Sequence, residues 1–210
     1  MAERPKPQIS SRKQPRQARS TELVAAILEA AVQVLAKDGV QRFTTARVAE
    51  RAGVSVGSLY QYFPNKAAIL FRLQSDEWRR TAALIGGILE ETGRPPRERL
   101  RALVHAFIRS ECEEAAVRVA LGDAAPFYRD APEAREARKA MEETFRRFMA
   151  ESLPTTDDAT RAQAGDLIRA TLSQVGRHIS QTPREPAEIA SCADAMADMF
   201  CAYLDSLEGG

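Results

Sequence analysis

Apolar residues recur at three- and four-residue steps along most of the chain, which is the spacing of amphipathic α-helices. The two-residue alternation typical of half-buried strands is not found, and there is no internal repeat. The pattern therefore predicts an all-α protein. The expected helices cover residues 20–37, 45–52, 55–62, 66–90, 97–114, 115–121, 132–152, 156–180 and 186–207.

Two of these helices, 45–52 and 55–62, are short and separated by a tight turn at Gly53. Glycine adopts the left-handed conformation that ends a helix at little cost. Residues that can cap a helix start stand before three successive helices: Thr44, Ser55 and Asn65. The glycine turn and the three helix caps predict a helix-turn-helix.

The second short helix carries small or hydrogen-bonding side chains and no charge. A helix that enters a major groove needs small residues where its backbone approaches the bases. The pattern therefore favours DNA binding. The alternative is a helical hairpin of the kind found in any all-α protein.

Specific motifs follow one another through this part of the chain. They are ILEAA at 27–31, KDG at 37–39, TT at 44–45, VA at 48–49, AGVS at 52–55, GSLYQYF at 57–63, PNK at 64–66 and Leu70. In this order and spacing, the stretch from about Ser20 to Leu73 resembles the DNA-binding domain of the tetracycline-repressor (TetR) family of bacterial transcriptional regulators. The resemblance covers roughly a quarter of the chain.

The resemblance implies an N-terminal three-helix helix-turn-helix domain at 20–66 and a C-terminal helical ligand-binding and dimerisation domain at 67–210. Ala46 stands where some family members place a base-reading Arg, and Arg47 is its neighbour, so which position contributes specificity is left open. The residues that the resemblance places on DNA are Thr44, Thr45, Arg47, Ser55, Val56, Gly57, Ser58, Tyr60, Tyr62 and Lys66.

Charge is divided unevenly along the chain, although the net charge is only +1. Residues 1–66 hold 11 Lys and Arg against 5 Asp and Glu, a balance of +6, and residues 67–210 have a balance of −5. A basic segment of this kind suits contact with phosphates. Residues 1–19, rich in Pro and basic side chains, predict a disordered basic arm that is either a solvated tail or a further DNA contact.

Composition argues against other classes of protein. No apolar run approaches the roughly 20 residues of a membrane span, and we expect no secretory signal. Three scattered cysteines suggest a reducing cytoplasm. The resemblance to bacterial regulators further implies a nucleoid-associated protein of the bacterial cytoplasm. Without metal-ligand spacing, a phosphate-binding glycine loop or a nucleophile–base set, we expect no enzyme activity and no cofactor.

The last two predicted helices carry long apolar stripes. The resemblance implies that they form a four-helix interface in a C2 homodimer. The alternative is that both stripes face the core of their own chain. The predicted interface residues are Ile168, Leu172, Val175, Ile179, Met196, Phe200, Tyr203 and Leu204.

The middle helices contain aromatic and titratable residues that could line a pocket for a small apolar or aromatic effector. Ordinary core or surface roles are the alternative for each of them. The candidates are Trp78, His105, Phe107, Cys112, Phe127, Tyr128, Phe145 and His178.

The sequence thus predicts a ligand-responsive transcriptional regulator, a repressor that releases a near-palindromic operator when its effector binds. An effector-independent architectural or cell-division DNA-binding protein of the same fold is the alternative. A third possibility is an all-α enzyme with a coincidental helix-turn-helix, which the lack of catalytic motifs disfavours.

Overall fold

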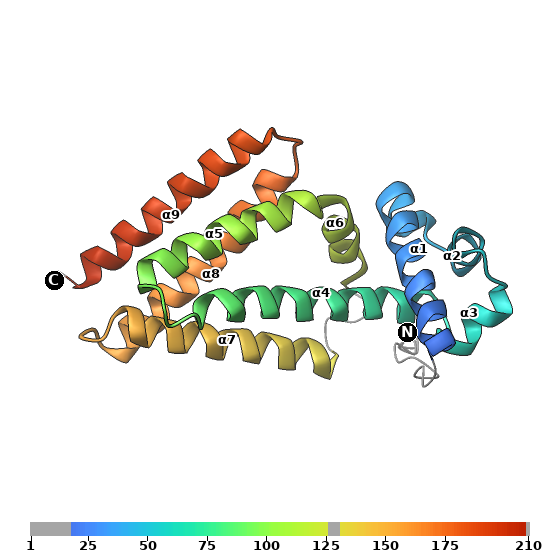
Figure 1. Cartoon of the computed structure of the whole chain (residues 1–210), viewed down its shortest axis with the longest axis horizontal. Coiled ribbons are helices and arrows are strands. Elements are labelled where there is room, and N and C mark those ends of the chain that lie inside the picture. Colours follow the sequence, from blue (N-terminus) through green and yellow to red (C-terminus); the bar gives the residue numbers. More distant parts are fainter. Residues whose placement is uncertain (1–17, 126–130, 209–210) are drawn as a thin grey trace, which may run out of the picture. The chain divides into compact units, whose positions relative to one another are not determined.

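The computed structural model describes residues 18–125 and 131–208, and in these ranges every regular element is a helix (Figure 1). The all-α prediction is confirmed. The helices are α1 (Ala18–Arg42), α2 (Thr45–Ala52), α3 (Val56–Tyr62), α4 (Lys66–Leu89), α5 (Pro96–Glu113), α6 (Ala115–Ala124), α7 (Pro132–Ser152), α8 (Asp158–Ser180) and α9 (Pro186–Glu208).

The end of α1 and the start of α8 differ from the prediction because of the residues found at these helix ends. Helix α1 extends to Arg42, but Gly39, with φ 69° and ψ 172°, interrupts its helical conformation at the predicted stop. Helix α8 begins later than predicted because Asp157 is its N-cap, accepting hydrogen bonds from the backbone N–H groups of Ala159 and Thr160. These bonds, with one from the Thr160 hydroxyl, lower the pKa of the Asp157 carboxyl.

The chain divides into two compact units. The described part of the first contains residues 18–78, 116–125 and 131–135. Buried side chains of α1, α2, α3, α4 and α6 form its core. Within this core the Arg118 guanidinium of α6 lies 2.6 Å from the carboxylate of the buried Glu77 on α4. The predicted domain border at residue 66 stays a prediction; the compact unit extends past it along α4 and also includes α6.

The predicted arm at residues 1–19 lies almost entirely outside the described residues. Its last two residues are an exception, because α1 already begins at Ala18. For these two positions the prediction of a disordered arm is corrected.

The second unit contains residues 79–115 and 136–208, and α5 packs against both α8 and α9 within it (Figure 1). Small residues allow these helices to approach closely. A Cβ atom on Gly176 of α8 would lie 3.1 Å from the Phe107 ring of α5, and one on Gly165 would lie 3.1 Å from Cγ of Met149 on α7. Both distances are shorter than comfortable van der Waals contact, so a larger residue at either position would require the neighbouring side chain to move by a few tenths of an ångström.

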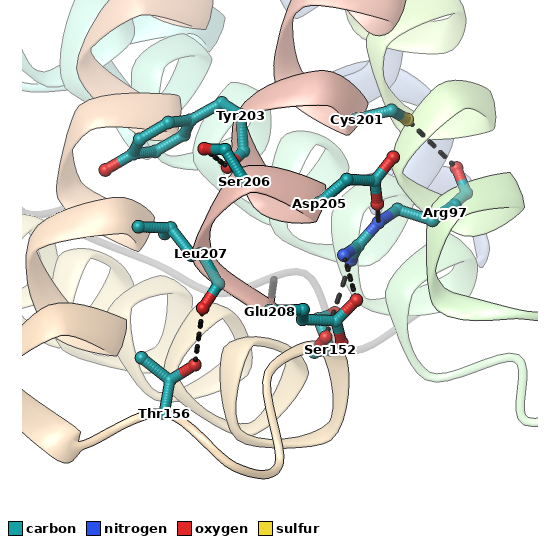
Figure 2. A network of polar contacts seen from close by, with 9 residues as sticks. All are labelled: Arg97, Ser152, Thr156, Cys201, Tyr203, Asp205, Ser206, Leu207 and Glu208. Atoms are coloured by element: carbon teal, nitrogen blue, oxygen red, sulfur yellow. Dashed lines mark hydrogen bonds and ion pairs between the residues drawn. The ribbon is translucent and has the colours of Figure 1, made fainter. Parts of the chain in front are cut away.

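Charged side chains four residues apart on α5 hold it antiparallel to α9. Arg97 pairs with Asp205 at 2.8 Å and with Glu208 at 2.9 Å, and it donates to the carbonyl oxygen of Ser152 (Figure 2). One helical turn further along α5, Arg101 pairs with Asp198. Such solvent-exposed ion pairs contribute little to stability, so their main effect is on the register of the two helices.

The next turn of α5 continues the same series, with Nε2 of His105 lying 2.9 Å from Asp194 of α9. The series therefore covers three successive turns of α5.

A buried arginine joins α5 to the ends of two other helices. The Arg99 side chain is 1% exposed, donates to the carbonyl oxygen of Leu89 at the end of α4, and pairs with Glu151 of α7. Its guanidinium also lies over the ring of Phe148, 5.6 Å from the centroid. A helix-terminal carbonyl otherwise without a partner is thereby satisfied inside the core.

The apolar stripes of α8 and α9 pack largely inside their own chain, where α5 and its neighbours shield them from solvent. The dimer interface that the resemblance implies for these residues stays a prediction. Val175 and Tyr203 are partly buried against the same core. The fully shielded residues are Ile168, Leu172, Ile179, Met196, Phe200 and Leu204.

Candidate nucleic-acid interface

Side-chain and backbone caps define the unit formed by α2 and α3. The Thr44 hydroxyl accepts a hydrogen bond from the backbone N–H of Arg47 at 3.3 Å, and the Ser55 hydroxyl accepts one from Ser58 at 3.0 Å. Gly53 has φ 67° and ψ 29°, and its N–H donates to carbonyls of the last turn of α2. The left-handed turn and both caps are therefore confirmed.

The third predicted cap is also present. Oδ1 of Asn65 accepts from the backbone N–H of Ala68 at 2.9 Å and starts α4. The beginning of α4 is thus fixed directly after α3, which leaves a connection of only residues 63–65 between the two helices.

Buried apolar side chains hold α2 and α3 at a fixed angle on α1. Val48, Ala49 and Leu59 are fully shielded and belong to one core. A hydrogen bond also links the two helices at the surface, since Oγ1 of Thr45 lies 3.1 Å from the Tyr60 hydroxyl. The helix-turn-helix is therefore a rigid base for the residues on its outer side.

The outward face of α3 consists of Val56, Gly57, Tyr60 and Gln61, which are all exposed. Val56 and Tyr60 are each 40% exposed although both are large and apolar. They lie one helical turn apart, so they share one side of the helix. No Asp, Glu, Lys or Arg occurs from residue 53 to residue 65, which makes this face electrically neutral.

No contact within the chain and no backbone angle requires glycine at position 57. A Cβ atom at this position would have a single neighbour within 4 Å, the Ser55 hydroxyl at 3.7 Å, which is an ordinary contact. Its φ is not positive, so the backbone does not require glycine either. The chain therefore does not require glycine here, although glycine in a helix costs about 0.5–1 kcal/mol relative to alanine, and the missing side chain leaves the backbone of α3 open to an outside partner.

Both arginines of α2 are held by side chains of α1. Arg47 forms an ion pair with Asp38 at 2.8 Å, and Nε of Arg51 donates to the Gln33 side chain. Arg47 is thus oriented by Asp38 in the free protein, while the neighbouring Ala46 is exposed. Sequence reasoning missed Asp38 and Gln33, because they lie 9 and 18 residues from their partners and no local pattern connects them.

The residues predicted to contact DNA differ in accessibility. Tyr62 is buried in the core, with only 6% of its surface exposed. A DNA contact by Tyr62 would have to use this small exposed part of its side chain. The exposed ones are Thr44, Ser55, Val56, Gly57 and Tyr60, and the partly exposed ones are Thr45, Arg47, Ser58 and Lys66.

The residues predicted to line an effector pocket have different surroundings, and the pocket itself stays a prediction. Trp78 packs edge-on against Phe71 in the first unit, whereas Phe107, Cys112 and Phe145 belong to the core of the second. His105 is bonded to Asp194 and His178 is exposed. The remaining two candidates, Phe127 and Tyr128, lie outside the described residues.

Two of the three cysteine thiols are made less reactive by their surroundings. Burial raises the pKa of the Cys112 thiol and that of the Cys201 thiol. A raised pKa keeps a thiol protonated and poorly nucleophilic. Within the described residues, no cluster of three or more His, Cys, Asp or Glu could hold a metal ion, and no helix is long and apolar enough to cross a membrane.

An all-α chain with a capped helix-turn-helix near its N-terminus belongs to the class of helix-turn-helix proteins. Two family models match it more specifically. "Bacterial regulatory proteins, tetR family" matches residues 27–73, and "Tetracyclin repressor-like, C-terminal domain" matches residues 95–207, which is more than half of the chain. The chain therefore belongs to the tetracycline-repressor family.

Two curated relatives share parts of the sequence. The chain is 30% identical over 139 residues to the HTH-type transcriptional repressor KstR of Rhodococcus jostii (strain RHA1), a match covering 65% of this chain and 64% of that protein. It is 51% identical over 41 residues to the nucleoid occlusion factor SlmA of Actinobacillus pleuropneumoniae serotype 5b, covering 19% and 20%. The chain spans between 60% and 65% of the length of the KstR relatives it matches.

Among solved structures, the fold is similar to that of the transcriptional regulator FadR from Bacillus subtilis, determined in complex with stearoyl-CoA. The TM-score is 0.65 at 17% sequence identity, and the match covers 84% of this chain and 97% of that chain. At this level of identity the likeness concerns the fold.

Proposed function

We propose that this protein is a DNA-binding transcriptional repressor that releases its operator when a small molecule binds the second compact unit. The observation that carries the proposal is the exposed, neutral and sterically open face of α3 on a rigid helix-turn-helix. Such a surface suits insertion into a major groove. The KstR match supports repression, since that relative is named a repressor and its alignment extends well beyond the helix-turn-helix.

The proposed DNA contacts divide into two groups. The outward residues of α3, led by Val56 and Gly57, face base edges. The side chains around them contact the phosphate backbone, which positions the protein without reading sequence. The proposed backbone contacts are Thr44, Thr45, Arg47, Ser55, Ser58, Tyr60, Tyr62 and Lys66.

The repressor acts as a homodimer, because one short recognition helix contacts too few bases for useful discrimination. Two such helices about 34 Å apart would meet successive major grooves and read a near-palindrome. With the stripes of α8 and α9 buried, the dimer has to use their remaining faces. Leu167 on α8 and Met199 on α9, each 51% exposed, support this arrangement.

The effector is a small molecule with an apolar part, and a long-chain acyl-CoA, whose acyl chain supplies one, is the first to test. The support is the FadR structure, which contains stearoyl-CoA in the same fold. An effector acts only if it binds the DNA-free conformation more tightly than the DNA-bound one. Helix α4 contributes residues to both compact units, so we propose that it carries this shift.

Mapping of bound sites across the genome tests the proposal and separates it from its alternative. One or a few sites beside the gene for the protein or its neighbours are expected for a repressor. Many sites spread along the chromosome would instead indicate the architectural or cell-division role, for which the short SlmA match is the support. The absence of any enriched site would refute both.

A further inference from the structure

The outward face of α3 lacks the groups that most often read guanine. The commonest specific contact to a G·C pair is made by Arg or Lys, which donate two hydrogen bonds to guanine O6 and N7. Neither residue occurs between residues 53 and 65. The two arginines of α2 are engaged with α1 in the free protein, since Arg47 pairs with Asp38 and Arg51 donates to Gln33.

Val56 contributes an exposed apolar side chain to this face. It stands at the first position of α3 and is 40% exposed, whereas Leu59 of the same helix is fully buried. Gly57 beside it leaves the backbone open, so a partner can approach Val56 closely without meeting another side chain. The only apolar group that base pairs present in the major groove is the C5 methyl of thymine.

We propose that Val56 reads a thymine by packing against its C5 methyl group, so that the recognised site requires a T·A base pair at this position. This inference rests on the proposed function, since it specifies how the same surface selects its DNA. Gly57 has a positioning role, because it allows the helix to come close enough for the methyl contact. Selection at this base pair is therefore made by shape and apolar contact without a charged group.

The test uses duplexes that the full-length protein selects from a randomised DNA library. In the selected duplex, each thymine is replaced in turn by deoxyuridine, which pairs identically with adenine but lacks the methyl group. Dissociation constants are measured for the wild-type protein, for Val56→Ala and for Val119→Ala. Val119 is a matched control because it is 50% exposed and lies on α6, away from the helix-turn-helix.

One thymine in each half of the selected site should be sensitive to the replacement. The expected loss for the wild-type protein is about fourfold per methyl group, the value for burying one carbon group of this size. Val56→Ala should bind the thymine duplex more weakly and lose its sensitivity at that position only. Val119→Ala should behave as the wild type.

Two other outcomes would count against the inference in different ways. Failure to select any duplex would remove the proposed function itself. A selected duplex that tolerates deoxyuridine everywhere, or that keeps the same sensitive position with Val56→Ala, would overturn the methyl contact while leaving DNA binding intact. Circular dichroism confirms that Val56→Ala is folded, as its exposed position leads us to expect.

Discussion

Substituting Gly57 by alanine should make the protein more stable and a poorer DNA binder. The added Cβ meets only the Ser55 hydroxyl at 3.7 Å, so it enters the folded chain without strain. Removing a helical glycine should then stabilise the fold by about 0.5–1 kcal/mol, because the unfolded chain loses conformational freedom. For a chain of this size, that corresponds to a rise in melting temperature of about 1–4 °C.

The same methyl group would lie between α3 and the bases. Inserting a methyl group into a closely packed contact typically costs about 1–3 kcal/mol, so affinity for a selected duplex should fall roughly five- to 150-fold. Calorimetry measures the first effect and a fluorescence anisotropy titration the second. A gain in stability together with a loss of DNA affinity would show that position 57 lacks a side chain because DNA approaches the backbone there.

Gly87→Ala is the matched control for this experiment. Gly87 is also helical and exposed, and a Cβ there would meet nothing within 4 Å, but it lies near the end of α4. It should gain a similar amount of stability and keep its affinity. If Gly57→Ala bound the duplex as tightly as Gly87→Ala does, no partner would approach the backbone of α3, and the reasoning from its open face would fail.

Three further variants test other parts of the structure. Lys66→Ala should weaken binding to all duplexes alike and reduce the slope of log affinity against log salt by about one, measured by salt titration. Gly176→Ala should destabilise the protein by about 1–3 kcal/mol in thermal unfolding, because its Cβ would press on Phe107 at 3.1 Å. Leu167→Glu with Met199→Glu should convert a dimer into monomers in light scattering, since charge would enter the proposed interface.

Each of these has a control and a contrary result. An unchanged salt slope would remove Lys66 from the phosphate contacts. For Gly176, Gly122→Ala is the comparison, because its Cβ has open space and should not destabilise. For the dimer, Val119→Glu places the same charge on a different exposed apolar site; dimers that survive the double substitution would show that the faces of α8 and α9 are not the interface.

Local capping made the helix-turn-helix predictable from sequence. Thr44, Gly53 and Ser55 each act within three or four residues of their position in the chain, so their roles follow from the sequence around them. Helix α7 was predicted over its full length, Pro132–Ser152, for a similar reason, since a proline opens it and another follows shortly after it.

Tertiary pairing was not predictable in the same way. The stripes of α8 and α9 show correctly which faces are buried, but periodicity does not reveal what covers them, and α5 of the same chain does so for most of their length. The Asp38–Arg47 pair was missed because only the packing of α1 on α2 brings the two side chains together. The pocket candidates were chosen by residue type and helix position, which do not reveal the neighbours of a side chain, so the sequence could not select among them.

The tethering of Arg47 to Asp38 bears on how the protein searches a chromosome. The Arg47 guanidinium has to leave Asp38 before it can bind a phosphate, so this contact adds little on arbitrary DNA and is made where α3 fits the groove closely. We therefore expect brief residence on unrelated sequence and a comparatively large gap between cognate and random DNA. A modest number of molecules per cell would then suffice to keep one operator occupied.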